Sequence, residues 1–113
     1  MTDAVVRSVL YLRPKGGDRD AIVDFYRRHG VLERALRQNG CLGAELHVPL
    51  QGDGEILVTA LWRDAGAYDG WVANPERAAH ADELAELAEG DFDSGVRGAV
   101  YDVVLSAQPG ERL

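Results

Sequence analysis

Apolar residues alternate with other residues along positions 4–13 (AVVRSVLYLR), and this period of two predicts a β-strand. One face is apolar apart from Ser8. The other face mixes apolar side chains with Arg7 and Arg13. We therefore expect the first face to pack against helices and the second to be more exposed to solvent or less completely covered.

Two further alternating segments, residues 41–50 and 55–63, predict a β-hairpin because Gln51-Gly-Asp-Gly between them is a tight reversal. The predicted core positions are Leu42, Ala44, Leu46, Val48 and Leu50 in the first strand, and Ile56, Val58, Ala60 and Trp62 in the second. Pro49 indicates that the first of these strands ends there or lies at a sheet edge. A last strand is expected over residues 95–106.

Apolar residues at three- and four-residue steps predict a helix over residues 18–39, with Asp18 as its N-cap and Gly40 beyond its end. Its stripe consists of Ile22, Phe25, His29, Leu32 and Leu36. Gly30 is expected to bend or split this helix, because glycine is a poor helix former.

Two more helix starts follow the third strand. Asp64 can cap a short helix that runs to about Val72. Asn74-Pro75 predicts a second start, with a helix to about Glu89 that Gly90 ends. His80 would lie on the same face of this helix as two leucines.

This order of elements, βαββαβ with two neighbouring helices in the second crossover, predicts an α+β, ferredoxin-like fold with a four-stranded antiparallel sheet. The chain is expected to form a single domain over residues 1–113, with a core over about 4–106 and a loose tail over 107–113. The uncovered sheet face is too apolar to remain exposed to solvent. It therefore predicts a homodimer, either with the sheets packed face to face or as a dimeric α/β barrel.

The composition narrows the class of protein. A net charge of −7 argues against binding to nucleic acid or anionic membranes, which need clustered basic residues. No apolar run is long enough to cross a bilayer, and the N-terminus lacks a signal-peptide pattern, so the cytoplasm is the expected compartment. Cys41 is the single cysteine, which excludes an intrachain disulfide and a thiolate metal cluster; we interpret it as a small buried residue.

The segment from Trp71 to His80 (WVANPERAAH) holds the strongest candidates for chemistry. From spacing alone, His80 is either a partly buried structural histidine or a ligand or base, and Trp71 is either core or a cavity wall. Trp62 is expected in the core or at its rim, His29 as a satisfied semi-buried residue, and His47 in solvent. Candidate pocket-lining aromatics are Tyr11, Phe25, Tyr26, Tyr68 and Tyr101.

Four segments in this order resemble the antibiotic biosynthesis monooxygenase (ABM) superfamily: FYRRHG from Phe25, CLGAEL from Cys41, VTALW from Val58, and Trp71 to His80. The resemblance covers about residues 5–105, and its nearest branch is the small heme-degrading monooxygenases. It implies the dimeric barrel, pockets between each sheet and its own helices, and oxygen chemistry that in many members needs neither flavin nor a dedicated metal.

In the heme-degrading branch an Asn, a Trp and a His form the functional set. Trp71 and His80 match the last two, so the resemblance implies that His80 would be the axial ligand and that Trp71 would distort the porphyrin. The first-strand position of the Asn holds Val9, which cannot donate a hydrogen bond to an oxygen. Acidic residues follow His80, and they disfavour heme propionates.

Three hypotheses follow. The first is an ABM-type monooxygenase that oxidises an aromatic or polycyclic small molecule with O2, without a cofactor, with His80 as base and Trp71 as pocket wall. Val9, Tyr11, Phe25, Trp62 and Tyr68 would complete the substrate site. The second is a heme-binding, heme-degrading monooxygenase with His80 as the iron ligand. The third is a non-catalytic, dimeric small-molecule-binding protein.

Overall fold

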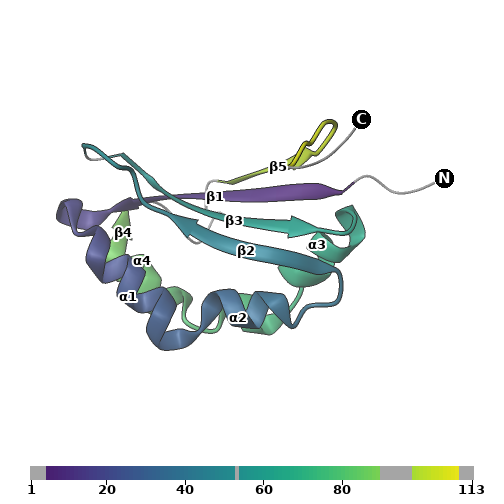
Figure 1. The fold of residues 1–113 in the computed structure, drawn as a ribbon. Coiled ribbons are helices and arrows are strands. Elements are labelled where there is room, and N and C mark those ends of the chain that lie inside the picture. Colours follow the sequence, from purple (N-terminus) through teal and green to yellow (C-terminus); the bar gives the residue numbers. More distant parts are fainter. Residues whose placement is uncertain (1–4, 53, 90–97, 110–113) are drawn as a thin grey trace.

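The structure, a computed structural model, describes residues 5–52, 54–89 and 98–109 and shows helices packed beneath one antiparallel sheet (Figure 1). No described helix is long and apolar enough to cross a membrane. The elements in chain order are β1 (Val6–Pro14), the 3-10 turn η1 (Lys15–Gly17), α1 (Arg19–His29), α2 (Val31–Leu36), β2 (Cys41–His47), β3 (Ile56–Trp62), α3 (Ala65–Val72), the 3-10 turn η2 (Pro75–Ala78), α4 (Ala81–Leu87), β4 (Ala88–Glu89) and β5 (Gly98–Asp102).

The strands lie in the order β2-β3-β1-β4, which confirms the ferredoxin-like topology. All described pairings are antiparallel. The edge beyond β1 carries two short strands instead of the single one predicted over residues 95–106. β4 pairs with Arg13 and Pro14 at one end of β1, and β5 pairs with residues 6–10. Residues 95–97 of the predicted strand lie outside the described residues.

The register of β1 on β3 explains which face forms the core. Leu12 pairs with Ile56 and Val6 with Trp62, and all four side chains are buried on the helix side. The core has two parts, one built around Leu12, Ile22, Phe25 and Ile56 and the other around Trp62 and Trp71. The alternation read from the sequence therefore selects the covered face correctly, because side chains on a strand point to opposite faces in turn.

The long helix predicted over residues 18–39 is split at Gly30, as its glycine indicated. Gly30 adopts φ 59° and ψ 41°, a left-handed conformation, and its N–H donates to carbonyls of the last turn of α1. The helix starts with Asp18, whose carboxylate accepts from the N–H of Ala21. The second part, α2, ends at Leu36, earlier than the predicted Asn39.

The helix predicted from Pro75 to Glu89 is not continuous. Asn74 caps the start as expected, accepting from the N–H of Glu76, but the first turn is the 3-10 turn η2. His80 has φ −126° and ψ 31° and stands at the N-cap of the separate helix α4. Ala88 is extended and pairs with Pro14, so the segment after Leu87 is a strand. Tertiary pairing with β1 thus overrides a helix-favouring composition.

The core positions predicted for the second strand are partly wrong. A register shift between Cys41 and Gly43 places Leu42 outward, and Leu42 is 55% exposed. Cys41 packs against the tryptophans in its place, half-buried, and burial raises the pKa of its thiol, consistent with a small structural residue. β2 ends at His47, so Val48 and Leu50 are exposed instead of buried. A bulge reverses the parity that alternation predicts.

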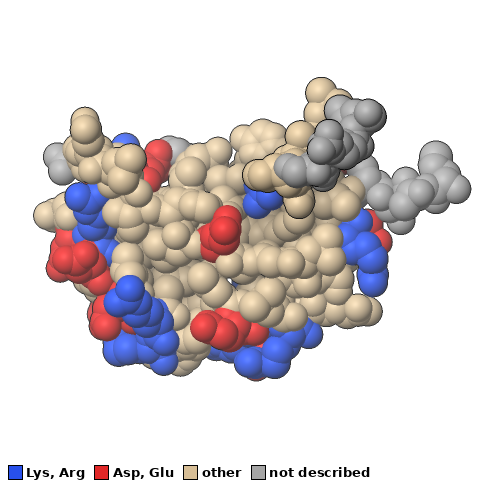
Figure 2. Space-filling view, viewed as in Figure 1, with Lys and Arg blue, Asp and Glu red and all other residues tan. Residues whose placement is uncertain are grey.

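The second face of the sheet has no helix over it in the described structure (Figure 1). The register places Val9, Thr59 and Ala99 side by side on it, with Tyr11 beside Leu57. In Figure 2 acidic and basic groups gather over the helices along the lower edge, whereas the surface over the strands is mostly uncharged. This sheet face without a helix cover is the one for which the sequence predicts a second copy of the chain.

Candidate functional site

His80 lies in a cluster of rings and charges between α1 and α4. Its imidazole stacks on that of His29, with centroids 3.8 Å apart and 21° between the ring planes. Phe25 packs edge-on against both histidines, at 4.8 Å from His29 and 6.4 Å from His80. We call Phe25, His29, His80 and Glu83 the histidine cluster. It brings one turn of α1 against the start of α4, so its members are far apart in the sequence.

Glu83 connects this cluster to the surface of α1. Its carboxylate contacts His29 Nε2 at 2.9 Å and accepts from the Arg28 guanidinium at 2.7 Å. Arg28 also donates to Asp24 one turn earlier. Hydrogen bonds from Arg28 and His29 lower the pKa of Glu83, so this carboxylate is ionised at neutral pH. A carboxylate that contacts one ring nitrogen fixes the orientation of the imidazole.

The surroundings of His80 favour its neutral form. Desolvation is the largest cause that lowers its pKa, followed by the charges of His29 and Arg34, and Glu83 opposes the shift. A histidine with a lowered pKa is unprotonated at pH 7 and can accept a proton. The half-buried His80 ring therefore has the protonation state that a general base or an iron ligand needs.

Trp71 belongs to a different packing unit. It is buried and stacks on Trp62, with centroids 6.5 Å apart, and Tyr68 packs edge-on against Trp62. The indole N–H of Trp62 donates to Ser8 Oγ at 3.0 Å. We call Ser8, Trp62, Tyr68 and Trp71 the tryptophan cluster. It confirms Trp62 as core.

The structure separates the predicted site residues into three groups. His80 and Phe25 lie in the histidine cluster, whereas Trp71, Trp62 and Tyr68 lie in the tryptophan cluster. Val9 and Tyr11 point to the sheet face opposite the helices, where the Tyr11 and Tyr101 hydroxyls are 3.4 Å apart. Ser8 and Leu10 flank Val9 in the chain and point to the helix side of β1. Of these two residues, Ser8 is the polar one.

Two charged residues of this region were not singled out by the sequence as site residues. Glu83 was noted only as an acid unfavourable to heme propionates, yet it is engaged by Arg28 and His29. Arg34 was not among the predicted site residues. It donates from Nη2 to the backbone carbonyl of His29 at 2.8 Å. The three-residue step from His80 to Glu83 was visible in the sequence, but the approach of α1 to α4 that gives it meaning was not.

His29 and His47 agree with their predicted environments. His29 is 18% exposed and bonded to Glu83, the satisfied semi-buried residue that was expected. His47 is exposed on the second sheet face and lies 2.9 Å from Thr59 Oγ1. Within the described ranges, no group of three His, Cys, Asp or Glu side chains could hold a metal ion.

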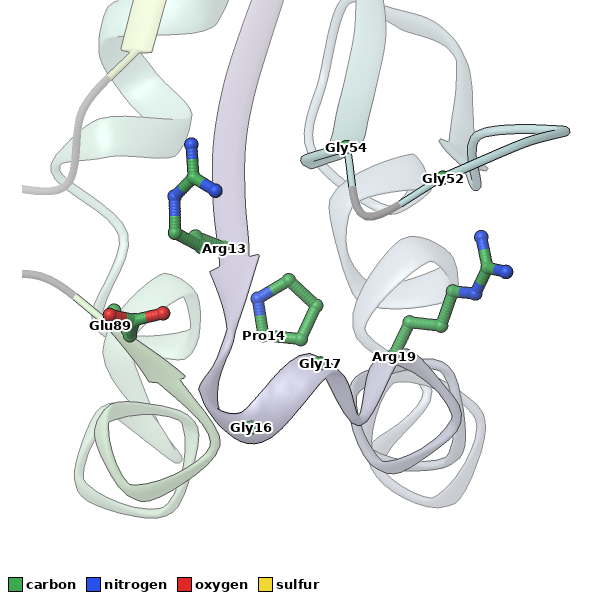
Figure 3. Close-up of a pocket in the computed structure, with 8 residues that line it drawn as sticks. All are labelled: Arg13, Pro14, Gly16, Gly17, Arg19, Gly52, Gly54 and Glu89. Carbon is green, nitrogen blue, oxygen red and sulfur yellow. The ribbon is translucent and has the colours of Figure 1, made fainter.

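A hollow of about 370 Å³ lies at the far end of β1, next to the η1 turn and the β2–β3 loop (Figure 3). Figure 3 shows Arg13 and Arg19 on opposite sides of Pro14, with Glu89 on the β4 side. Glycines form much of the remaining wall: Gly16, Gly17, Gly52 and Gly54. Its lining includes none of the predicted site residues, and its polar, open character is unlike a site for an aromatic molecule.

The fold and the histidine cluster define a ferredoxin-like α+β protein with a neutral imidazole on its helix side. The chain belongs to the antibiotic biosynthesis monooxygenase family, since the model of that family matches residues 5–89. No curated protein matches the chain.

Several solved structures share this fold. Rv0793 from Mycobacterium tuberculosis is 17% identical with a TM-score of 0.73, and the match covers 93% of this chain and 100% of that one. SnoaB from Streptomyces nogalater, a cofactor-independent oxygenase, is 18% identical with a TM-score of 0.69, covering 96% and 99%. MhuD (Rv3592) from Mycobacterium tuberculosis, a heme-degrader with two hemes bound in its active site, is 26% identical with a TM-score of 0.65, covering 92% and 99%.

Proposed function

We propose that this protein is an ABM-type monooxygenase that oxidises an aromatic or polycyclic small molecule with O2, without flavin or a dedicated metal. The observation that carries the proposal is the half-buried His80 ring, stacked on His29 and kept neutral by its surroundings. The family and the fold shared with the cofactor-independent oxygenase SnoaB support this chemistry.

The proposed reaction starts with proton transfer from an acidic C–H or O–H of the substrate to the neutral imidazole of His80. The resulting carbanion or phenolate supplies electrons to O2. For a ring methylene the balance is CH2 + O2 → C=O + H2O. One oxygen atom enters the substrate and the other leaves as water. All four electrons come from the substrate, so no external reductant is needed.

The direct test is O2 consumption with a set of polycyclic phenols and their methylene tautomers. His80→Gln keeps a polar side chain of similar reach but removes the base, and we expect a rate loss of about 10²- to 10⁴-fold. The matched control is His47→Gln, because His47 lies on the other face of the sheet. Equal rates for wild type and His80→Gln would exclude His80 as the base.

Heme binding is the second candidate, favoured by the 26% identity to MhuD and by the neutral imidazole. His80 would hold the iron, and heme would supply the activation of O2. A hemin titration tests this reading: a Soret shift in wild type that His80→Ala abolishes supports it, and identical spectra for the two proteins exclude it.

A non-catalytic binding role is the third hypothesis. One comparison distinguishes it from the cofactor-independent and the heme-dependent oxygenase. Products formed with candidate phenols are compared after aerobic and anaerobic incubation. An oxygenase gives oxygenated products only with O2, whereas a binding protein gives the same result in both atmospheres.

We also propose that the second sheet face is covered by the same face of another copy of the chain. The support is its apolar character: Val9, Leu57 and Leu61 project from the two central strands, and Tyr101 is 50% exposed at the edge. Sedimentation at micromolar concentration tests this, and a monomer would contradict it.

A further inference from the structure

Arg34 is placed unusually for a residue of a short surface helix. It projects from α2, is half-buried, and donates from Nη2 to the carbonyl of His29, the last residue of α1. That bond anchors the guanidinium beside the histidine cluster. Its positive charge is among the causes that lower the pKa of His80, so it acts on the same ring.

The Nε atom of Arg34 is buried and has no hydrogen-bond partner among the described residues. A buried donor without an acceptor costs free energy, and native proteins satisfy nearly all such groups. No other buried side-chain polar atom in the described part of the chain lacks a partner. The unsatisfied group therefore lies on the helix side of the sheet, in a side chain that is bonded to His29.

A guanidinium is suited to a negatively charged oxygen. It stays protonated, and its planar fork presents N–H groups in a fixed geometry. One arm already holds the His29 carbonyl, so the fork is pre-oriented, and less side-chain freedom is lost when the Nε–H finds an acceptor. The half-buried rings of His29 and His80, which stack on each other with Phe25 edge-on to both, offer aromatic contacts for the rest of a ligand.

We propose that Arg34 binds the anionic oxygen of an aromatic substrate through its Nε–H, beside His80. The substrate class is a phenol or enol that ionises on binding. This inference rests on the proposed function, and it adds the group that stabilises the charge left when His80 removes the proton. A cation at that oxygen lowers the free energy of the deprotonated substrate.

The probe is a naphthol, compared with its O-methyl ether, which has the same rings but cannot ionise. Binding is measured without O2, so that no turnover occurs, and the absorbance of bound naphtholate gives the pKa of the bound naphthol. Wild type should bind the naphthol more tightly than the ether and lower its pKa. Arg34→Gln should weaken naphtholate binding by about 10- to 100-fold and leave the ether unchanged.

Two further variants keep the test interpretable. Arg34→Lys retains the charge and should keep part of the preference for naphtholate. Arg37→Gln is the matched control, because Arg37 follows α2 and is exposed, 4.0 Å from Glu76. It should bind both probes as wild type does.

Each outcome has a separate meaning. Wild-type preference for the naphthol, lost in Arg34→Gln, supports the inference. Equal binding of the naphthol by wild type and Arg34→Gln overturns it, and so does a wild type that binds neither probe. If Arg34 governs naphtholate binding but no phenol is oxidised in air, the proposed oxygenase function fails while the oxygen-binding role of Arg34 stands. If oxidation proceeds equally in Arg34→Gln, the function stands and the inference fails.

Discussion

The imidazole rings of His29 and His80 stack at 3.8 Å, one at the end of α1 and the other at the start of α4. Two stacked imidazoles are not easily both protonated, because their positive charges would face each other in a partly desolvated place. Glu83 lies 2.9 Å from His29 Nε2. Glu83 therefore holds the ring of His29 in place, and the surroundings of His80 lower its pKa and favour a neutral ring there.

The first prediction concerns pH. The folded-state pKa of His80 lies below its ordinary value, so the unfolded chain binds more protons as the pH falls through that value, about 6.5. The stability that this residue contributes is present above about pH 6.5 and is lost below it. Thermal unfolding between about pH 7 and pH 5 should show a fall in Tm that is smaller in His80→Gln. A fall of equal size in both proteins would contradict the assignment.

The lowered pKa of His80 also predicts how activity falls at acid pH, the acid limb of the pH profile. If His80 is the base, kcat/KM should decrease as the pH falls through a value below about 6.5, since the protonated ring cannot accept a proton. Replacing His29 with Gln removes one positive neighbour, so the limb should move to higher pH. His47→Gln serves as the control and should leave the limb in place.

The hydrogen bond between Trp62 and Ser8 is predicted to support the tryptophan cluster. Ser8→Ala leaves the indole N–H of a fully buried side chain without its acceptor, which should cost about 1–3 kcal/mol of unfolding free energy. Urea unfolding measures this. In a Trp62→Phe background the same Ser8→Ala change should cost much less, because no donor remains. Equal costs in the two backgrounds would show that the bond contributes nothing.

Gly40 is predicted to tolerate no side chain. It has φ 93°, and a Cβ built there lies 2.5 Å from Ala67 Cβ, so Gly40→Ala combines backbone strain with overpacking and should destabilise by about 2–4 kcal/mol. Gly43→Ala is the control, because a Cβ at Gly43 meets no atom within 4 Å. Chemical denaturation of both variants checks the difference, and similar midpoints would contradict it.

The proposed dimer predicts a selective effect of charge. Val9→Glu places a carboxylate on the central strand of the second sheet face, where burial by a partner would leave it unpaired. Sedimentation should then show a monomer or a strongly weakened dimer. Val72→Glu makes the same change at an exposed position of α3 and should leave the association intact. A wild-type association state for Val9→Glu would place the interface elsewhere.

Much of the fold was predictable, because alternation along β1 and β3 reports burial directly. Leu12, Ile56 and Trp62 were assigned to the covered face and are fully buried. The caps at Asp18 and Asn74 and the break at Gly30 were also read correctly, since each depends on local backbone chemistry. The predicted burial was wrong where pairing with another strand decides it. The bulge in β2 leaves Leu42 exposed, although alternation had assigned it to the core.

For the candidate site, the sequence located His80 and Trp71 through their spacing but could not show their neighbours. It interpreted Glu83 as a surface acid, whereas the packing of α4 on α1 turns it into the partner of His29. It also named Val9 as a substrate-site residue, and the register places Val9 on the sheet face without helices.

The sequence by itself determined the order of the elements, the covered face of the sheet and the family, because periodicity, caps and motifs are local. Only the tertiary structure decided that His80 stacks on His29 and that Trp71 stacks on Trp62, so that Trp71 and His80 lie in different clusters. It also placed the unsatisfied Nε of Arg34 beside the histidines. These contacts join α1 and α2 to α4, and β3 to α3. The strand register and the break at Gly30 set the positions of these elements. No local pattern encodes the distance between residues that become neighbours only when the helices pack.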